Sequence, residues 1–503
     1  MSTDGSNGWA ADMVFDGASH GFTYDDIIFM PGEMCFEAGE ASVKTQITKN
    51  RSLGLPLVAA PSDALTESRM AMELALAGGI GFIHCNQTVE SQVEMVKRVK
   101  RYYNGFILEP VTLSPEHLVE DVDQIKLAYG FSGVAITENG KLGSRVVGIV
   151  TGRDIDAIED RKTRLSEVMT RDVVLRVQGC SLAEAYEYMM KKKVAKLPIV
   201  DDANCLVSLV SRGDLKKKMS LKNATLDSCG RLAVGAAINP DGQGDWERAE
   251  ELIKAGADIL CLDTTCSHDS YELKFISRLK EEYPAVDIVA GPVSACRAAK
   301  YLCDAGVDGV IVGSLSSSMG MGLECRNFGR PEATATFEIA RYVALNYGLP
   351  TIAVGNLRNP GQILKAFGLG ASAVMLDDFL AGTDEASGSC TMRNGACVKL
   401  MHGADAISAV VGGTEDRTQL RYQTANDAIV GKGSVHALAA HVAASLRNGL
   451  CDLGIQSIPS LHKALYDGDL KMESRGFFGQ KQEELQALKA QRSSCQYIEP
   501  LLV

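Results

Sequence analysis

The stretch that decides the fold is Ala305-Gly-Val-Asp-Gly-Val-Ile-Val-Gly313, a turn of small residues followed by a short apolar run. The same plan occurs in Ala255-Gly-Ala-Asp-Ile-Leu-Cys-Leu-Asp263, Val286-Asp-Ile-Val-Ala-Gly291, Leu349-Pro-Thr-Ile-Ala-Val-Gly355 and Gly370-Ala-Ser-Ala-Val-Met-Leu376. Runs this apolar are typical of strands buried on both faces, and segments of helical length separate them. Several such units in one region predict an α/β fold, a (β/α)8 TIM barrel rather than an open sheet.

The amino-terminal part of the chain begins the same pattern. It contains the run Leu55-Pro-Leu-Val-Ala-Ala60, a helix expected over 67–77, and Gly78-Gly-Ile-Gly-Phe-Ile-His84. The pattern is then interrupted and resumes near Gly230, so we predict that the barrel is split by an insertion. The predicted boundaries give barrel segments at 1–109 and 227–503, with the insert at 110–226.

The insert is expected to be a tandem repeat of two similar units. The first ends in Val147-Gly-Ile-Val-Thr-Gly-Arg-Asp154 and the second in Leu206-Val-Ser-Leu-Val-Ser-Arg-Gly-Asp214. The second unit also contains Met169-Thr-Arg-Asp172 and Lys196-Leu-Pro-Ile-Val-Asp201.

Composition excludes several classes of protein. The net charge of -12 and the lack of a Lys/Arg-rich tract argue against a nucleic-acid partner. No window reaches about 18 unbroken apolar residues, and the acidic start over 1–16 does not resemble a signal peptide, so we expect a cytoplasmic protein without a membrane contact. The 14 cysteines form no CxxC pair, so neither a disulfide scaffold nor a metal site is expected.

The chain resembles the IMP dehydrogenase/GMP reductase family along essentially its whole length. Shared segments include Phe22-Thr-Tyr-Asp-Asp-Ile27, the glycine-rich run that ends at His84, and Leu446-Arg-Asn-Gly-Leu450. The insert resembles the pair of CBS modules found in this family. Arg421-Tyr422 lies where the dehydrogenases carry an Arg-Tyr pair that the reductases lack, which favours the dehydrogenase branch.

The resemblance implies a mechanism and its residues. In the dehydrogenases a loop cysteine attacks C2 of IMP, hydride passes to NAD, and a mobile flap brings the Arg-Tyr pair to activate water. The flap candidates here are Arg421 and Tyr422. Asp263, Thr264 and Thr265 match the family's dinucleotide-contacting D-S-S. For Asp263 a second interpretation stays open, in which a carboxylate at a strand end caps the following helix.

The nucleophile loop has two alignments. Relatives read approximately G-x-G-x-G-S-x-C-x-T, and an alignment without gaps from Val312-Gly313 to Gly329-Arg-Pro331 puts Gly320 at the cysteine position. A shifted alignment uses Cys325 as the nucleophile, but it requires five residues inserted before the loop and five removed after it. The alternative for Cys325 is an incidental loop thiol.

Four substrate-binding positions also depart from the family. Relatives bind phosphate with Gly-Ser where this chain has Asp377-Asp378, and two carboxylates repel a phosphate dianion by about 4 kcal/mol per charge pair at about 4 Å and an effective dielectric of about 20. The ribose-binding aspartate is replaced by Val354, and the asparagine of a G-N-V motif by Pro292. Neither replacement can make the lost hydrogen bond.

Three functions remain open on this evidence. The first is a catalytically silent paralogue with an assembly, regulatory or structural role, which needs no cofactor. The second is an active, NAD-dependent IMP dehydrogenase that uses Cys325, and the third is a barrel with a different, less anionic ligand. The CBS pair is expected to bind ATP, GTP or AMP through Asp154 and Asp214, whose motifs resemble the ribose-binding motifs of CBS domains. Expected partners are further copies in a homotetramer or octamer, an active paralogue, or another protein.

Overall fold

Two units make up the chain in a computed structural model. Unit 1 contains Met1–Lys97 and Ala233–Val503, and unit 2 contains Arg98–Leu232. The structure describes residues 9–15, 21–103, 106–107, 110–129, 133–156, 158–177, 180, 182–211, 223–240, 244–263, 270–313, 330–388, 390–393, 396–400 and 428–475. Within these ranges no helix is both long enough and apolar enough to span a bilayer.

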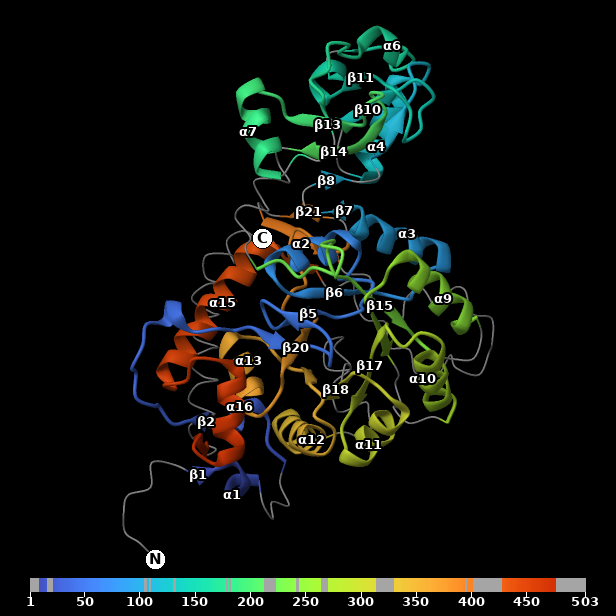
Figure 1. The fold of residues 1–503 in the computed structure, drawn as a ribbon. Coiled ribbons are helices and arrows are strands. Elements are labelled where there is room, and N and C mark those ends of the chain that lie inside the picture. Colours follow the sequence, from blue (N-terminus) through green and yellow to red (C-terminus); the bar gives the residue numbers. More distant parts are fainter. Residues whose placement is uncertain are drawn as a thin grey trace, which may run out of the picture. The chain divides into compact units, whose positions relative to one another are not determined.

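Eight parallel strands close into a barrel in unit 1 (Figure 1), which confirms the predicted (β/α)8 fold. In order around the barrel they are β15 (Gly235–Ile238), β16 (Ile259–Asp263), β17 (Asp287–Val293), β18 (Gly309–Gly313), β19 (Thr351–Val354), β20 (Ala373–Leu376), β5 (Leu57–Ala59) and β6 (Ile80–Ile83). The helices that follow them along the chain are α2 (Ser68–Ala77), α3 (Val89–Lys100), α9 (Asp245–Ala255), α10 (Ser270–Glu282), α11 (Cys296–Ala305), α12 (Glu332–Tyr347), α13 (Pro360–Gly368) and α15 (Val435–Asp452).

The remaining described elements of unit 1 lie outside this alternation. They are β1 (Trp9–Ala10), α1 (Ala11–Phe15), η1 (Tyr24–Asp26), β2 (Ile27–Phe29), η2 (Ala38–Glu40), β3 (Thr45–Gln46), β4 (Ser52–Leu53), β21 (Cys390–Arg393), β22 (Ala396–Leu400), β23 (Ala428–Val430), α16 (Ile458–Asp467) and β24 (Lys471–Ser474). Strand β24 pairs with both β1 and β2, so the two ends of the described chain share one small sheet.

The barrel strands form where the sequence is almost entirely apolar, with polar side chains only at strand ends, as at Asp263, Asp287 and Thr351. All residues of β5, β6, β15, β18, β19 and β20 are buried, because the strands face the barrel interior on one side and helices on the other. Helix α2 begins at Ser68, one residue after the expected start, and ends at Gly78, whose φ of 102° favours glycine. The alternation of apolar runs and glycine turns therefore predicted the barrel for the correct physical reason.

The hairpin β3–β4 closes the amino-terminal end of the barrel through buried aspartates. Thr48 donates a hydrogen bond of 2.7 Å to Asp287, the first residue of β17. Arg51 lies 3.3 Å from Asp287 and 3.2 Å from Asp258, which precedes β16. Both carboxylates are almost fully buried, so this network of charges ties the hairpin to two neighbouring strands.

Unit 2 contains a structural repeat. Its elements are β7 (Tyr102–Tyr103), β8 (Phe106–Ile107), β9 (Thr112–Leu113), α4 (Val119–Tyr129), β10 (Val134–Thr137), β11 (Val146–Val150), α5 (Gly152–Ile155), α6 (Leu165–Val168), β12 (Arg176–Val177), α7 (Leu182–Lys192), β13 (Lys196–Val200) and β14 (Leu206–Ser211). The order strand, helix, strand, strand occurs twice, as β9-α4-β10-β11 and as β12-α7-β13-β14. In each copy the second strand pairs with the first in parallel and with the third antiparallel.

Candidate functional site

The carboxyl ends of the barrel strands form the face on which TIM-barrel proteins place their active sites. Among the described residues, titratable side chains with shifted pKa values gather on one arc of this face, which we call the polar arc. It is formed by the ends of β5, β6 and β16, which carry Asp63, His84 and Asp263. Six further candidate residues lie outside the described residues: Thr264, Thr265, Gly320, Cys325, Arg421 and Tyr422.

Asp263 is the last residue of β16 and is largely buried. Burial raises the pKa of its carboxyl group to about 6. No hydrogen bond or ion pair joins Asp263 to another described residue. The capping interpretation of Asp263 stays open, because residues 264–269, which precede the first described residue of α10 at Ser270, lie outside the described residues. A largely buried carboxylate with no partner among the described residues, at the face where TIM barrels bind ligands, is also suited to accept hydrogen bonds from a ligand hydroxyl.

Asp63 and His84, which follow the neighbouring strands β5 and β6, influence each other's charge. Burial raises the pKa of the Asp63 carboxyl, while the charge of His84 opposes this shift. Burial lowers the pKa of the His84 imidazole, and the charge of Asp63 opposes that shift in turn. Asp63 Oδ1 and His84 Nδ1 are both buried without a hydrogen-bond partner in the described part of the chain. Two polar atoms in this state indicate a binding site, because such atoms are rarely left unsatisfied.

Arg248 on α9 stabilises the segment that follows β6 through hydrogen bonds to Gln92 and Gln87. Its guanidinium group donates to Gln92 Oε1 at 2.7 Å and to the carbonyl oxygen of Gln87 at 3.0 Å. The buried Gln92 amide donates in turn to the carbonyl oxygens of Ile83 and Ala237, at 3.1 and 2.9 Å. Gln92 therefore joins β6 to β15, and the positive charge of Arg248 contributes to the lowered pKa of His84.

The sequence interpretation did not select Asp63, His84 or Arg248. One signal was available, since Asp63 and His84 both follow an apolar barrel strand within four residues, where side chains reach the ligand face. No comparable signal marks Arg248, because its contacts join residues about 160 positions apart in the sequence.

The opposite side of the face, which we call the apolar arc, carries the ends of β17, β18 and β19. The candidate positions there are Pro292 and Val354, whose side chains have no hydrogen-bonding group, and β18 between them ends at Gly313. Val354 is only 3% exposed. Gly313 has a φ of 124°, and a Cβ atom there would lie 2.0 Å from the carbonyl oxygen of Val354, so these two strand ends pack too closely for any side chain at position 313.

Asp377 and Asp378 follow β20 in a tight turn. The carbonyl oxygen of Asp377 accepts hydrogen bonds from the backbone N–H groups of Leu380 and Ala381, both at 2.9 Å. The ammonium group of Lys432 donates to the carbonyl oxygen of Asp378 at 2.7 Å. Backbone hydrogen bonds therefore fix the turn. The charge of Lys432 also interacts with the Asp378 carboxylate, a contact that the spacing in the sequence did not indicate.

In unit 2, Asp154 is the third residue of a capping box on α5. Its Oδ2 accepts hydrogen bonds from the backbone N–H and the hydroxyl of Thr151, both at 2.7 Å, and its Oδ1 accepts one from Thr170 at 3.3 Å. Asp214, the corresponding candidate of the second repeat, lies outside the described residues.

Replacing Asp263 by asparagine is expected to stabilise the protein, and more so at high pH. The carboxyl pKa of about 6 in the folded chain exceeds the ordinary value of 3.8, so the folded state binds the proton more tightly than the unfolded state. The ionised carboxylate therefore lowers the free energy of unfolding. This loss is absent below pH 4 and complete above pH 6, where it reaches about 3 kcal/mol. In urea titrations, the advantage of Asp263→Asn should grow by about 1 to 2 kcal/mol between pH 5 and pH 8. A constant advantage over this range would contradict the prediction.

Comparisons with known proteins agree with this architecture. Residues 21–477 match the model of the IMP dehydrogenase / GMP reductase domain. Inosine-5'-monophosphate dehydrogenase from Toxoplasma gondii is 37% identical, with 96% of this chain and 98% of the relative covered. The enzyme of the same name from Schizosaccharomyces pombe is 36% identical, covering 94% and 93%.

Among solved structures, a GMP reductase variant from Trypanosoma brucei in complex with guanosine 5'-monophosphate superposes with a TM-score of 0.78 at 30% identity, covering 93% of this chain and 98% of that one. The Trypanosoma brucei GMP reductase in complex with guanosine 5'-triphosphate gives a TM-score of 0.73 at 29% identity, covering 92% and 99%. The family match and the full-length relatives lead to one conclusion: this chain belongs to the IMP dehydrogenase/GMP reductase family.

Proposed function

We propose that this chain is a catalytically silent member of its family, with an assembly, regulatory or structural role. The observation that carries the proposal is the division of the ligand face into a polar and an apolar arc. A nucleoside monophosphate requires polar groups for its ribose and phosphate, whereas the described candidate positions at the ends of β17 and β19, Pro292 and Val354, offer no hydrogen-bonding side chain. The test is NADH formation at saturating IMP and NAD, for which no turnover is expected.

The nucleophile loop supports the same proposal. Its flanks are regular elements, since β18 ends at Gly313 and α12 begins at Glu332 after Pro331. With both flanks anchored, the alignment that needs no gap is the simpler one, and it assigns Gly320 to the cysteine position. A glycine has no side chain with which to form the covalent intermediate. An active NAD-dependent IMP dehydrogenase remains the alternative, with Cys325 as nucleophile and Arg421 and Tyr422 on the flap.

A second candidate function rests on the polar arc. The buried carboxyl of Asp263 and the neighbouring Asp63 and His84 can accept or donate hydrogen bonds to a nucleoside hydroxyl or a carboxamide. These residues fit the dinucleotide that active relatives use, and they equally fit a different ligand with less negative charge. Binding without hydride transfer would be consistent with a regulatory role. NAD binding to the native protein, lost in Asp263→Ala, would support this candidate.

The insert in unit 2 is proposed to be a CBS pair that binds adenine or guanine nucleotides. The repeated strand, helix, strand, strand order supports a tandem module, and one solved relative is a complex with guanosine 5'-triphosphate. Calorimetric titration with ATP, GTP and AMP should give binding heat at or below millimolar ligand, and Asp154→Ala should weaken it about 10-fold, the effect of about one hydrogen bond to a charged group. No heat from any of the three nucleotides would contradict the proposal.

The assembly is proposed to be a homotetramer that pairs into octamers through the insert, in the cytoplasm, with co-assembly with an active paralogue as the alternative. Closed symmetric assemblies are the general rule for soluble oligomers. Light scattering at micromolar protein is expected to give four times the chain mass of 53.8 kDa, and eight times that mass when nucleotide is added. A monomer mass under both conditions would contradict it.

A further inference from the structure

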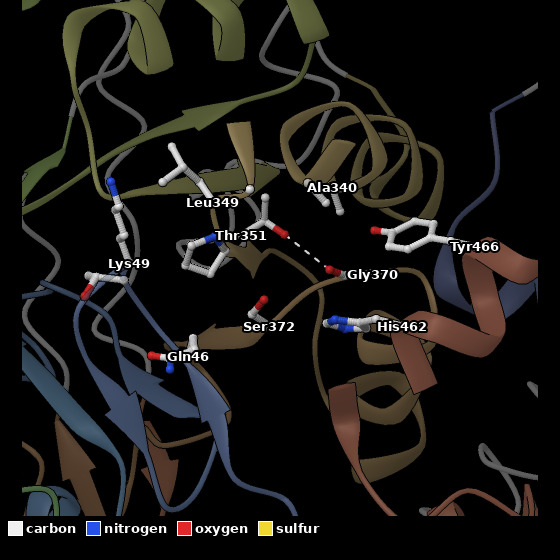
Figure 2. A pocket seen from close by; sticks show the side chains of 13 residues that line it. Gln46, Lys49, Ala340, Leu349, Thr351, Gly370, Ser372, His462 and Tyr466 are labelled. Atoms are coloured by element: carbon white, nitrogen blue, oxygen red, sulfur yellow. Dashed lines mark hydrogen bonds between the residues drawn. The ribbon is translucent and has the colours of Figure 1, made fainter. Parts of the chain in front are cut away.

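A cavity of about 300 Å³ opens at the amino-terminal end of the barrel strands, whereas Asp263 lies at a carboxyl strand end. Figure 2 shows the side chains that line the cavity. Three parts of unit 1 enclose it: the hairpin β3–β4, the end of α12, and α16. Its floor is formed by the residues that begin β19 and precede β20, among them Thr351 and Ser372. None of these residues belongs to the proposed nucleotide site.

One wall of the cavity contains a buried hydroxyl group with no partner. Tyr466 points its ring into the cavity from α16 (Figure 2). Its hydroxyl oxygen is buried and has no hydrogen-bond partner in the described part of the chain. Burial raises the pKa of Tyr466 to about 12, so the group is a neutral donor at physiological pH. Leaving such a donor unsatisfied is unfavourable, and a ligand acceptor in the cavity would satisfy it.

Further donors face the same space. The Ser372 hydroxyl and the Gln46 amide line the cavity, and neither side chain has a hydrogen-bond partner among the described residues. The Thr351 hydroxyl differs, since it donates to the carbonyl oxygen of Gly370 at 3.4 Å. His462 is also engaged, with Nε2 at 2.9 Å from the carbonyl oxygen of Ala371. Each of the groups left over for a ligand can therefore donate a hydrogen bond to a ligand oxygen.

Among the residues that line the cavity, Lys49 carries the one positive charge. Lys49 lies at its edge (Figure 2) and forms no ion pair with a described residue. Burial lowers the pKa of His462, which keeps that imidazole neutral. The nearest buried acids are already paired, Asp287 with Arg51 and Asp308 with Lys280 at 2.8 Å. One cation and several neutral donors fit one negative charge better than two.

We propose that this cavity binds a small organic carboxylate. The carboxylate would lie between the Lys49 ammonium and the Ser372 and Tyr466 hydroxyls, and its hydrocarbon part would contact Ala344 and Leu349 on the apolar side. The volume equals that of about ten water molecules at about 30 Å³ each, which accommodates a ligand of about ten non-hydrogen atoms. A ligand of this size is expected to bind with a dissociation constant on the order of 1 mM.

The test uses benzoate as the probe and ligand-observed NMR of the full chain as the measurement. Benzoate should show saturation transfer from the protein, whereas benzyl alcohol, similar in shape but neutral, should bind at least 10-fold more weakly. Lys49→Gln removes the cation, and Ala344→Leu fills the cavity. Each variant should lower the affinity for benzoate by 10-fold or more. The matched control is Lys44→Gln, an exposed residue of the same segment outside the cavity, which should leave binding unchanged.

The variant Tyr466→Phe distinguishes an effect on benzoate binding from an effect on the stability of the fold. Without ligand it should melt at the same temperature as the parent or higher, because it removes an unsatisfied hydroxyl, yet it should bind benzoate about 5-fold more weakly. The proposal is overturned if benzoate does not bind the parent at 20 mM, or if Lys49→Gln and Ala344→Leu bind it as the parent does. Binding of inorganic phosphate at the same residues without benzoate binding would overturn the carboxylate assignment.

Discussion

Purified protein at saturating IMP and NAD is expected to form no NADH above background. With GMP and NADPH, it is expected not to oxidise NADPH above background. In the alignment without gaps, Gly320 takes the cysteine position and the covalent route is absent; binding energy elsewhere cannot replace it, because only interactions gained in the transition state accelerate a reaction. Loss of polar anchors at Val354 and Pro292 costs about 1 to 3 kcal/mol each. Together with the carboxylates at 377 and 378, these losses weaken substrate affinity by about a thousand-fold or more if they act independently.

The control for this assay is a Cys325→Ala variant. If the loop follows the alignment without gaps, parent and variant should be equally inactive. Turnover in the parent that disappears in the variant would establish the shifted alignment, with Cys325 as the nucleophile of a working enzyme. Turnover that survives in both would also contradict a silent protein, and it would point to a nucleophile that neither alignment names.

The barrel was predictable because its strands repeat one local pattern. Each apolar run follows a small-residue turn, as before β16 and β18, and strands buried on both faces need apolar residues at every position. The strand-end placement of the candidate residues Asp263, Pro292 and Val354 was predictable for a related reason, whereas their roles stay predictions. Their positions are fixed by counting from the end of a strand, and the structure places all three at carboxyl strand ends.

Contacts between residues far apart in the chain could not be predicted from the sequence. Three contacts join residues that only the closed barrel brings together. They are the hydrogen bond from Arg248 to Gln92, the hydrogen bond from Lys432 to Asp378, and the ion pair between Arg51 and Asp287. Periodicity reports which face of an element is buried, but it does not say which element packs against it. The same limit explains why the cavity at Tyr466 has no sequence signature, since it is lined from three separate segments of the chain.

The double variant Asp377→Gly/Asp378→Ser is expected to bind IMP about 100-fold more tightly than the parent. It removes two negative charges from the position where relatives bind phosphate, and it restores the Gly-Ser of the family motif. The gain is smaller than the full Coulomb energy of two charge pairs, because Asp378 is exposed to solvent and Lys432 already offsets part of the repulsion. The turn itself should persist, since the hydrogen bonds from Leu380 and Ala381 go to the backbone carbonyl of residue 377.

Calorimetric titration with IMP measures this gain, and inosine serves as the second ligand. Because only IMP carries the phosphate, inosine affinity should change less than 3-fold in the double variant. Asp467→Ser, which removes an exposed charge at the end of α16, is the matched control and should leave IMP affinity unchanged. An equal gain for inosine would place the effect in the barrel rather than at the phosphate, and no gain for IMP would mean that these aspartates do not face the ligand. A gain confined to IMP, without NADH formation, would separate the two defects: the phosphate site can be restored by two substitutions, while the missing nucleophile still prevents the reaction.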